Sequence, residues 1–171
     1  MSDNTIGSRS ILALATVLAI LMAGCSSQVG GGNNPIAFAA VGPMTGSAAA
    51  RGKDLAQAAR MAADEANAAG GVNGHRIDLA VYDDGDQLQR ASQLAGQIAA
   101  TPAVAVLGQV ASSAAISAGE VYKQRRIPAI TGAASEVRVT RGNDWFFRLF
   151  RSAAGQGDFL ADYARCRSAR I

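Results

Sequence analysis

Short apolar runs alternate with helical patterns from Pro35 onward, and this alternation constrains the fold more than any other feature of the sequence. Buried strands separated by helices are typical of βαβ units, which place their strands in a parallel sheet. The runs predict strands at 36–41, 77–82, 104–107, 127–131 and 146–150. We therefore predict an α/β fold with a doubly wound parallel sheet.

The segments between these strands carry helix patterns and helix boundaries. The first predicted helix spans 52–69 and ends at a pair of glycines. Its apolar positions lie on one predicted face, which is formed by Leu55, Ala58, Ala59, Ala62 and Ala66. Asp86 is expected to cap the second helix, with Gln89 as its capping-box partner. Ser112 is expected to cap a third helix that runs to about Gln124.

Three predicted strand-exit loops carry small hydroxyl residues. They are Gly42–Gly46, Gly108–Ser113 and Gly132–Ser135. In open parallel sheets, small molecules bind at the carboxyl ends of the strands. Ser112 and Ser113 also fall where a helix begins, and free N–H groups and the helix dipole favour an anion there. A ligand carboxylate can accept hydrogen bonds from the Ser112 hydroxyl and from N–H groups near Ser112 and Ser135. The alternative is that Ser112 serves only as a helix cap.

The N-terminal segment predicts export. Ile11–Met22 is an apolar run that would reach roughly 18 Å as a helix, which is short of a bilayer core of about 30 Å. That length fits the hydrophobic region of a signal peptide. Leu21-Met22-Ala23-Gly24-Cys25 follows and resembles a bacterial lipobox, in which the cysteine is lipidated and cleavage precedes it. We expect 1–24 to be a lipoprotein signal peptide and Cys25 the lipidation site. A plain signal peptide, with Cys25 an ordinary thiol, is the alternative.

Residues 25–35 are rich in Gly and Asn and predict a flexible tether between the lipidated cysteine and the folded domain.

The charge of the chain excludes one class of partner. The net charge of +3 arises from Arg165, Arg167 and Arg170 near the end of the chain, so no nucleic-acid surface is indicated. Cys166 is expected to be a lone thiol, with a Cys25–Cys166 disulfide as the alternative.

The sequence offers no assembled catalytic or metal-binding motif. Its single histidine, His75, lies in a glycine-rich turn and is expected at the surface. Asp83, Asp84 and Asp86 lack the spacing of a calcium-binding loop. Neither a G-x-S-x-G motif nor the Gly-Lys-Ser/Thr ending of a phosphate loop is present. We expect no cofactor, no metal, and binding instead of catalysis.

Several short motifs follow one another in a fixed order between Ile36 and Gly157. They are Gly42–Gly46 with Gly52, Glu65–Gly74, Asp83-Asp84, Gly108 with Ser112-Ser113, Ile127-Pro128 with Ile130-Thr131, and Phe147-Arg148 before Gly155–Gly157. In order and spacing they resemble the leucine/isoleucine/valine-type periplasmic binding proteins, the solute-binding components of ABC importers. The resemblance covers most of the chain behind the lipobox.

The resemblance implies a periplasmic binding protein type I lobe, one of two lobes that close on a ligand by a hinge. Residues 36–150 would form the N-terminal ligand-binding lobe, and residues 151–171 would form the hinge and the start of the second lobe. This last segment has an atypical tail, and the chain is expected to be truncated before the second lobe. In such proteins the residues matching Ser112 and Ser135 hold the ligand carboxylate, and the carbonyl matching Ala133 accepts from its ammonium group. One lobe alone is expected to bind weakly.

One position departs from the family pattern. The residue before Gly52 is often aromatic in branched-chain amino-acid binders, but here it is Arg51. Its guanidinium can pair with an acidic ligand side chain or point into solvent, and a strict leucine specificity is not expected.

The expected function is therefore to bind amino acids, of the branched-chain type or related small polar solutes, for an ABC importer. The resemblance implies permease and ATPase subunits as partners and a place in the periplasm or at the outer face of the cell membrane, with the lipid as anchor. A sensory ligand-binding module of the same fold is one alternative. A flavodoxin-like enzyme is another.

Overall fold

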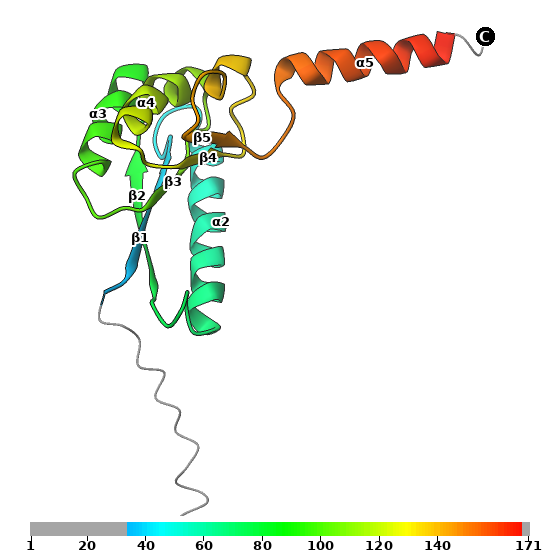
Figure 1. Cartoon of the computed structure of the whole chain (residues 1–171). Helices are drawn as coiled ribbons and strands as arrows, with labels where there is room; N and C mark the ends of the chain where they lie inside the picture. Colours follow the sequence, from blue (N-terminus) through cyan, green and yellow to red (C-terminus); the bar gives the residue numbers. More distant parts are fainter. Residues whose placement is uncertain (1–33, 169–171) are drawn as a thin grey trace, which may run out of the picture. The chain divides into compact units, whose positions relative to one another are not determined.

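The computed structural model describes residues 34–168, which contain one parallel sheet (Figure 1). Its strands are β1 (Ile36–Gly42), β2 (Ile77–Asp83), β3 (Ala105–Gly108), β4 (Ala129–Thr131) and β5 (Phe146–Arg148). They are ordered β2-β1-β3-β4-β5, and every neighbouring pair is parallel. All five predicted strands are present, and the predicted α/β parallel sheet is confirmed. The predicted signal peptide, Cys25 and most of the predicted tether lie outside the described residues.

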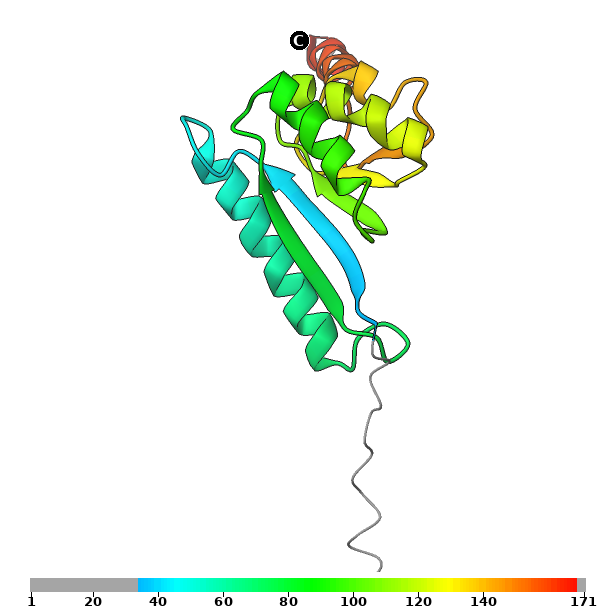
Figure 2. The same cartoon turned by 90° about the vertical axis from the view of Figure 1, so that its left-hand side faces the viewer.

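Helices lie on both faces of the sheet. They are α2 (Ala49–Ala68), α3 (Leu88–Ile98) and α4 (Ser112–Arg125), and a further helix, α5 (Ala153–Ser168), follows β5. Figures 1 and 2 show α2 beside β1 and β2 on one face, with α3 and α4 on the other. The arrangement is doubly wound, as the sequence predicts.

The face covered by α3 and α4 holds the hydrophobic core. Alternate strand residues point to this face and are buried, among them Val41, Val106, Ala129 and Phe146. The helices meet them with a series of buried alanines, namely Ala91, Ala95, Ala114, Ala115 and Ala118. Because alanine has a small side chain, both helices can lie close to the sheet.

On the other face, α2 covers β1 and β2 and leaves part of the sheet uncovered. Ala40 of β1 is completely buried there, whereas Phe147 of β5 is 50% exposed. The buried residues of α2 are Gly52, Ala56 and Ala63. The predicted apolar face of this helix is therefore only partly covered. Ala58 and Ala62 are exposed because they point towards the uncovered strands.

The N-terminal part of α2 lies close against the segment that follows β1. A Cβ atom on Gly52 would lie 2.0 Å from the carbonyl oxygen of Pro43, so only glycine fits without a shift of the backbone. The contact holds α2 beside the β1 exit loop, which lies at the carboxyl edge of the sheet.

Two predicted helix caps are wrong. Asp86 has a positive φ of 59° and precedes α3 by two residues; the N-cap residue is Gln87, which makes no side-chain capping bond. Ser112 is the first residue of α4, and Ala111 is its N-cap. The Ser112 hydroxyl is therefore available for a different contact.

Candidate functional site

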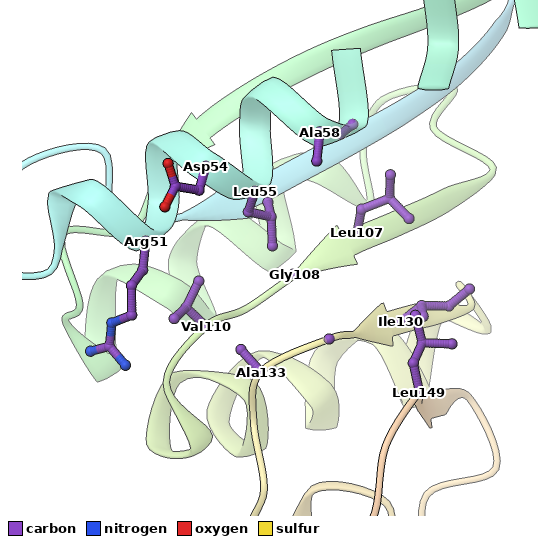
Figure 3. Close-up of a pocket in the computed structure, with 12 residues that line it drawn as sticks. Arg51, Asp54, Leu55, Ala58, Leu107, Gly108, Val110, Ile130, Ala133 and Leu149 are labelled. Carbon is purple, nitrogen blue, oxygen red and sulfur yellow. The ribbon is translucent and has the colours of Figure 1, made fainter. Parts of the chain in front are cut away.

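A cavity of about 500 Å³ opens between α2 and the carboxyl ends of β3, β4 and β5 (Figure 3). Arg51 and Asp54 of α2 lie at one end of this cavity. The other end is apolar and is lined by Ala58, Leu107, Ile130 and Leu149. The cavity thus joins two surfaces, the rim formed by the strand-exit loops and the uncovered face of the sheet.

The start of α4 and the loop after β4 are joined by one hydrogen bond. The N–H of Glu136 donates to Oγ of Ser112 at 3.3 Å, which brings the predicted residues Ser112 and Ser135 to the same edge of the sheet. Ser112 still has its own hydroxyl proton to donate. The N–H groups of Ser112 and Ser113 belong to the first turn of the helix and have no partner within it. The edge therefore offers several hydrogen-bond donors and the positive end of a helix dipole.

Thr131, the last residue of β4, holds the loop after that strand by hydrogen bonds. Its buried hydroxyl donates to the carbonyl oxygen of Gln109 at 2.8 Å and accepts from the N–H groups of Ala133 and Ala134. This arrangement turns the loop so that Ala133 lines the cavity. Neither Thr131 nor Gln109 was predicted as a site residue. A hydroxyl residue at the end of a buried strand was the available signal for Thr131.

Asp83 organises the loop after β1. Its carboxylate accepts from the Met44 N–H at 2.7 Å, from the Thr45 hydroxyl at 2.7 Å and from the Gly85 N–H at 2.9 Å, and Arg90 lies 3.5 Å away. Partial burial acts to raise the pKa of Asp83, but these hydrogen bonds and Arg90 outweigh it and hold the pKa below its usual value. Asp83 is thus a support for the rim.

Behind the rim lies a buried polar cluster. Gln109 donates through Nε2 to the hydroxyl of Tyr122 at 3.3 Å, and burial raises the pKa of Tyr122 to about 12. Burial likewise raises the pKa of Asp84. Among the described residues, Oδ2 of Asp84 and Oε1 of Gln109 are buried without a hydrogen-bond partner. None of Asp84, Gln109 and Tyr122 lines the cavity.

The structure brings the predicted site residues to one edge of the sheet, but not all of them into the cavity. Arg51 and Ala133 line it. Ser112 and Ser135 are not among the lining residues; Ser112 begins α4, and the carbonyl of Ser135 accepts from the Ala153 N–H at 2.8 Å. Ser113 is exposed at the start of α4. Val110 was not predicted and lines the cavity beside Ala133 (Figure 3).

The described part of the chain contains neither a grouping of metal-binding side chains nor a membrane-spanning helix. Within residues 34–168, no three His, Cys, Asp or Glu side chains are grouped so that they could hold a metal ion. None of the helices in that range has both the length and the apolar character needed to cross a bilayer.

Comparison with known proteins identifies relatives of this chain. Residues 35–169 match the family model described as periplasmic binding protein. An amino acid binding protein of Pseudomonas aeruginosa is 36% identical over 130 residues, which cover 75% of this chain and 35% of that protein. The Leu/Ile/Val-binding protein of Escherichia coli is 30% identical over 129 residues, with the same coverage of 75% and 35%. The chain spans about a third of the length of these relatives.

A solved structure has the same fold. The branched-chain amino acid transporter substrate-binding protein of Streptococcus pneumoniae, in complex with isoleucine, superposes with a TM-score of 0.67 at 27% identity, covering 70% of this chain and 34% of that one. The family match covers most of the chain, and the parallel sheet agrees with it. The chain therefore belongs to the periplasmic binding protein family, and within it to the leucine/isoleucine/valine type.

Proposed function

We propose that this chain forms the N-terminal lobe, and so one side of the amino-acid binding site, in the solute-binding component of an ABC importer. The observation that carries the proposal is the hydrogen bond between Glu136 N–H and Ser112 Oγ, because it gathers the donors of α4 and of the β4 exit loop at one edge. A carboxylate placed there would accept from the Ser112 hydroxyl and from the N–H groups of the first helical turn. Hydrogen bonds to a charged group contribute about 1.5–3 kcal/mol each.

The remaining ligand contacts follow from the neighbouring loops. The Ala133 carbonyl would accept from the ligand ammonium group, and Ser135 would donate its hydroxyl to the carboxylate. The ligand side chain would extend towards the cavity, whose lining includes Leu55 and Val110. An apolar side chain of the kind found in leucine, isoleucine or valine suits such a lining. Arg51 is exposed at the polar end of the cavity, and we propose that it faces solvent when such a ligand is bound.

The proposed cellular role follows the family. The chain would be exported to the periplasm or the outer face of the cell membrane, held there by lipid on Cys25, and would present its ligand to permease and ATPase subunits. The resemblance to proteins named for amino-acid binding supports this role. Binding, without catalysis, is the activity we propose.

The test is a titration of the purified full chain followed by amide chemical shifts in NMR spectra, which detect weak binding. L-leucine should shift the amides of 112–114 and 132–136, whereas leucinamide, which lacks the carboxylate, should shift them far less. Ser112→Ala should weaken leucine binding about tenfold. Ser117→Ala, in the same helix, is the matched control and should leave binding unchanged. Leucine and leucinamide shifting the same amides equally would contradict the proposal.

A further inference from the structure

Arg148 is the last residue of β5, next to the loop that carries some of the proposed ligand contacts. It is paired in register with Thr131, the residue after which that loop begins. Its side chain is half-buried. Nη1 donates to the Glu136 carbonyl oxygen at 2.8 Å, and Nη2 donates to Oγ1 of Thr140 at 3.3 Å. The guanidinium therefore binds both residues that flank the short helix η2 (Val137–Val139).

The charge of Arg148 is not neutralised by an acidic side chain. None of the ion pairs formed within residues 34–168 includes Arg148. The carboxylate of Glu136 is paired with Arg138 instead, and the two acceptors of the Arg148 guanidinium are a carbonyl and a hydroxyl, which carry no net charge. A full positive charge therefore remains at this end of β5.

This charge lies close to the donors of the proposed carboxylate site. The Glu136 N–H donates to Oγ of Ser112 at 3.3 Å, while the carbonyl of the same residue accepts from Arg148. Because the main chain of one residue joins the two bonds, Nη1 of Arg148 lies at most about 10 Å from Oγ of Ser112. Charges interact over about 10 Å in 0.1 M salt, and partly buried charges are screened less than exposed ones.

Other charges at this edge of the sheet do not cancel that of Arg148. Asp83 and Asp84 lie at the end of β2, and β1, β3 and β4 separate β2 from β5. At the polar end of the cavity, Arg51 and Asp54 carry opposite charges. The start of α4 at Ser112 adds the positive end of a helix dipole. The edge between α4 and β5 is therefore positive.

We propose that Arg148 makes the site select ligands that carry a carboxylate, although it does not touch the ligand. This inference rests on the proposed function, because it requires the carboxylate to bind beside Ser112. The guanidinium is held by neutral acceptors of its own chain, so its charge is in place before a ligand arrives. Complementary charge of this kind contributes specificity. Small carboxylates such as amino acids are favoured, and the corresponding amides and esters are disfavoured.

A purely structural role, in which Arg148 only holds the loop, predicts the opposite result for a change at Thr140. Thr140→Asp places a carboxylate at the position that accepts from Nη2 of Arg148. The new ion pair keeps Arg148 in place through a stronger hydrogen bond and cancels its charge. A structural role predicts unchanged ligand selection in this variant, whereas a role of the charge predicts a loss. Thr140→Asn, which also offers an acceptor but no charge, is the matched control.

The experiment titrates the purified full chain with L-leucine and with leucinamide, and follows the amides of 112–114 by NMR. The quantity compared is the ratio of the two affinities. This ratio should fall about tenfold in Thr140→Asp, because one unit charge near the carboxylate is cancelled. Arg148→Gln, which removes the charge outright, should lower it to the same extent. Thr140→Asn should keep the wild-type ratio. Circular dichroism should show the same fold in all the variants.

The outcomes separate this inference from the proposed function. A wild-type chain that binds leucine and leucinamide equally would overturn both. A wild-type preference for leucine that persists in Thr140→Asp and in Arg148→Gln would overturn only the role of Arg148. A loss in Thr140→Asn as large as that in Thr140→Asp would also overturn it, because shape at position 140 would then matter and charge would not.

Discussion

The two faces of the sheet are built from the same strands but differ in how they are covered. In β5, Phe146 points to the face with α3 and α4 and is 2% exposed, whereas its neighbour Phe147 points to the other face and is 50% exposed. In β3, Val106 is fully buried and Leu107 is not. The strands themselves are apolar on both sides, as strands of doubly wound sheets are.

The difference shows that an apolar strand sequence indicates that both faces of the strand should be buried. It does not indicate which element of the structure packs on each face. On the closed face, α3 and α4 follow β2 and β3 in sequence and provide the alanines that pack on them. On the open face, α2 covers β1 and β2, and apolar residues of β3 to β5 remain partly exposed.

The largest expected effect comes from the adjacent phenylalanines. Phe146→Ala removes a buried ring that packs near Tyr122, so it should lower the free energy of unfolding by about 3–5 kcal/mol. Phe147→Ala should lower it by about 1 kcal/mol or less, because half of that ring is already in water. Urea unfolding of both variants measures the difference. Equal losses would mean that the open face is covered in solution as completely as the closed one.

A smaller effect is expected from glycines in the helices of the two faces. Gly52→Ala in α2 places a methyl group against the Pro43 carbonyl and should cost about 2 kcal/mol or more. Gly96→Ala in α3 meets no atom within 4 Å and should stabilise the protein by about 1 kcal/mol. Thermal unfolding gives the signs. A stable Gly52→Ala variant would show that α2 can move away from the rim.

The smallest effects concern the two aspartates at the end of β2, and they depend on pH. The pKa of Asp83 is lowered by folding, so its contribution to stability is present above the unfolded value of 3.8 and is lost as the pH falls through the folded pKa. The pKa of Asp84 is raised by burial, so its contribution is complete below 3.8 and is lost as the pH rises through the folded pKa.

Substitution by asparagine should separate the two. Asp83→Asn should destabilise the protein at neutral pH, and the difference from wild type should shrink in acid. Asp84→Asn should remove the loss of stability that wild type shows as the pH rises above 3.8. Urea unfolding across a pH series measures both, and parallel pH profiles for the two variants would contradict the assignment.

Strand positions and the edge that carries the exit loops could be predicted from the sequence, because they depend on local apolar runs and on the rule that parallel strands end together. Helix caps could not. The pattern at Asp86 fits a capping box, but Asp84 accepts from the Asp86 N–H and turns the chain before α3 begins. The exposed positions of α2 could not be predicted either. Ala58 and Ala62 fit the apolar face of the helix, and the local sequence does not show whether another element packs on them.

Around the candidate site, the position of Ser112 at a helix start could be predicted, whereas contacts between residues far apart in the sequence could not. Ser112 stands at a helix start, which the sequence shows. The role of Thr131 depends on the Gln109 carbonyl, 22 residues earlier in the chain, and only the folded sheet brings the two together.

The peptide group of Glu136 has a consequence for how this sequence can change over evolution. Its N–H donates to Ser112 and its carbonyl accepts from Nη1 of Arg148 at 2.8 Å, so the main chain makes both of these bonds. Position 136 can therefore drift among most amino acids without loosening the link between α4 and β5, although proline would remove the donor. Arg148 and Ser112 act through their side chains and have no such freedom, so related sequences should vary at 136 and keep the other two.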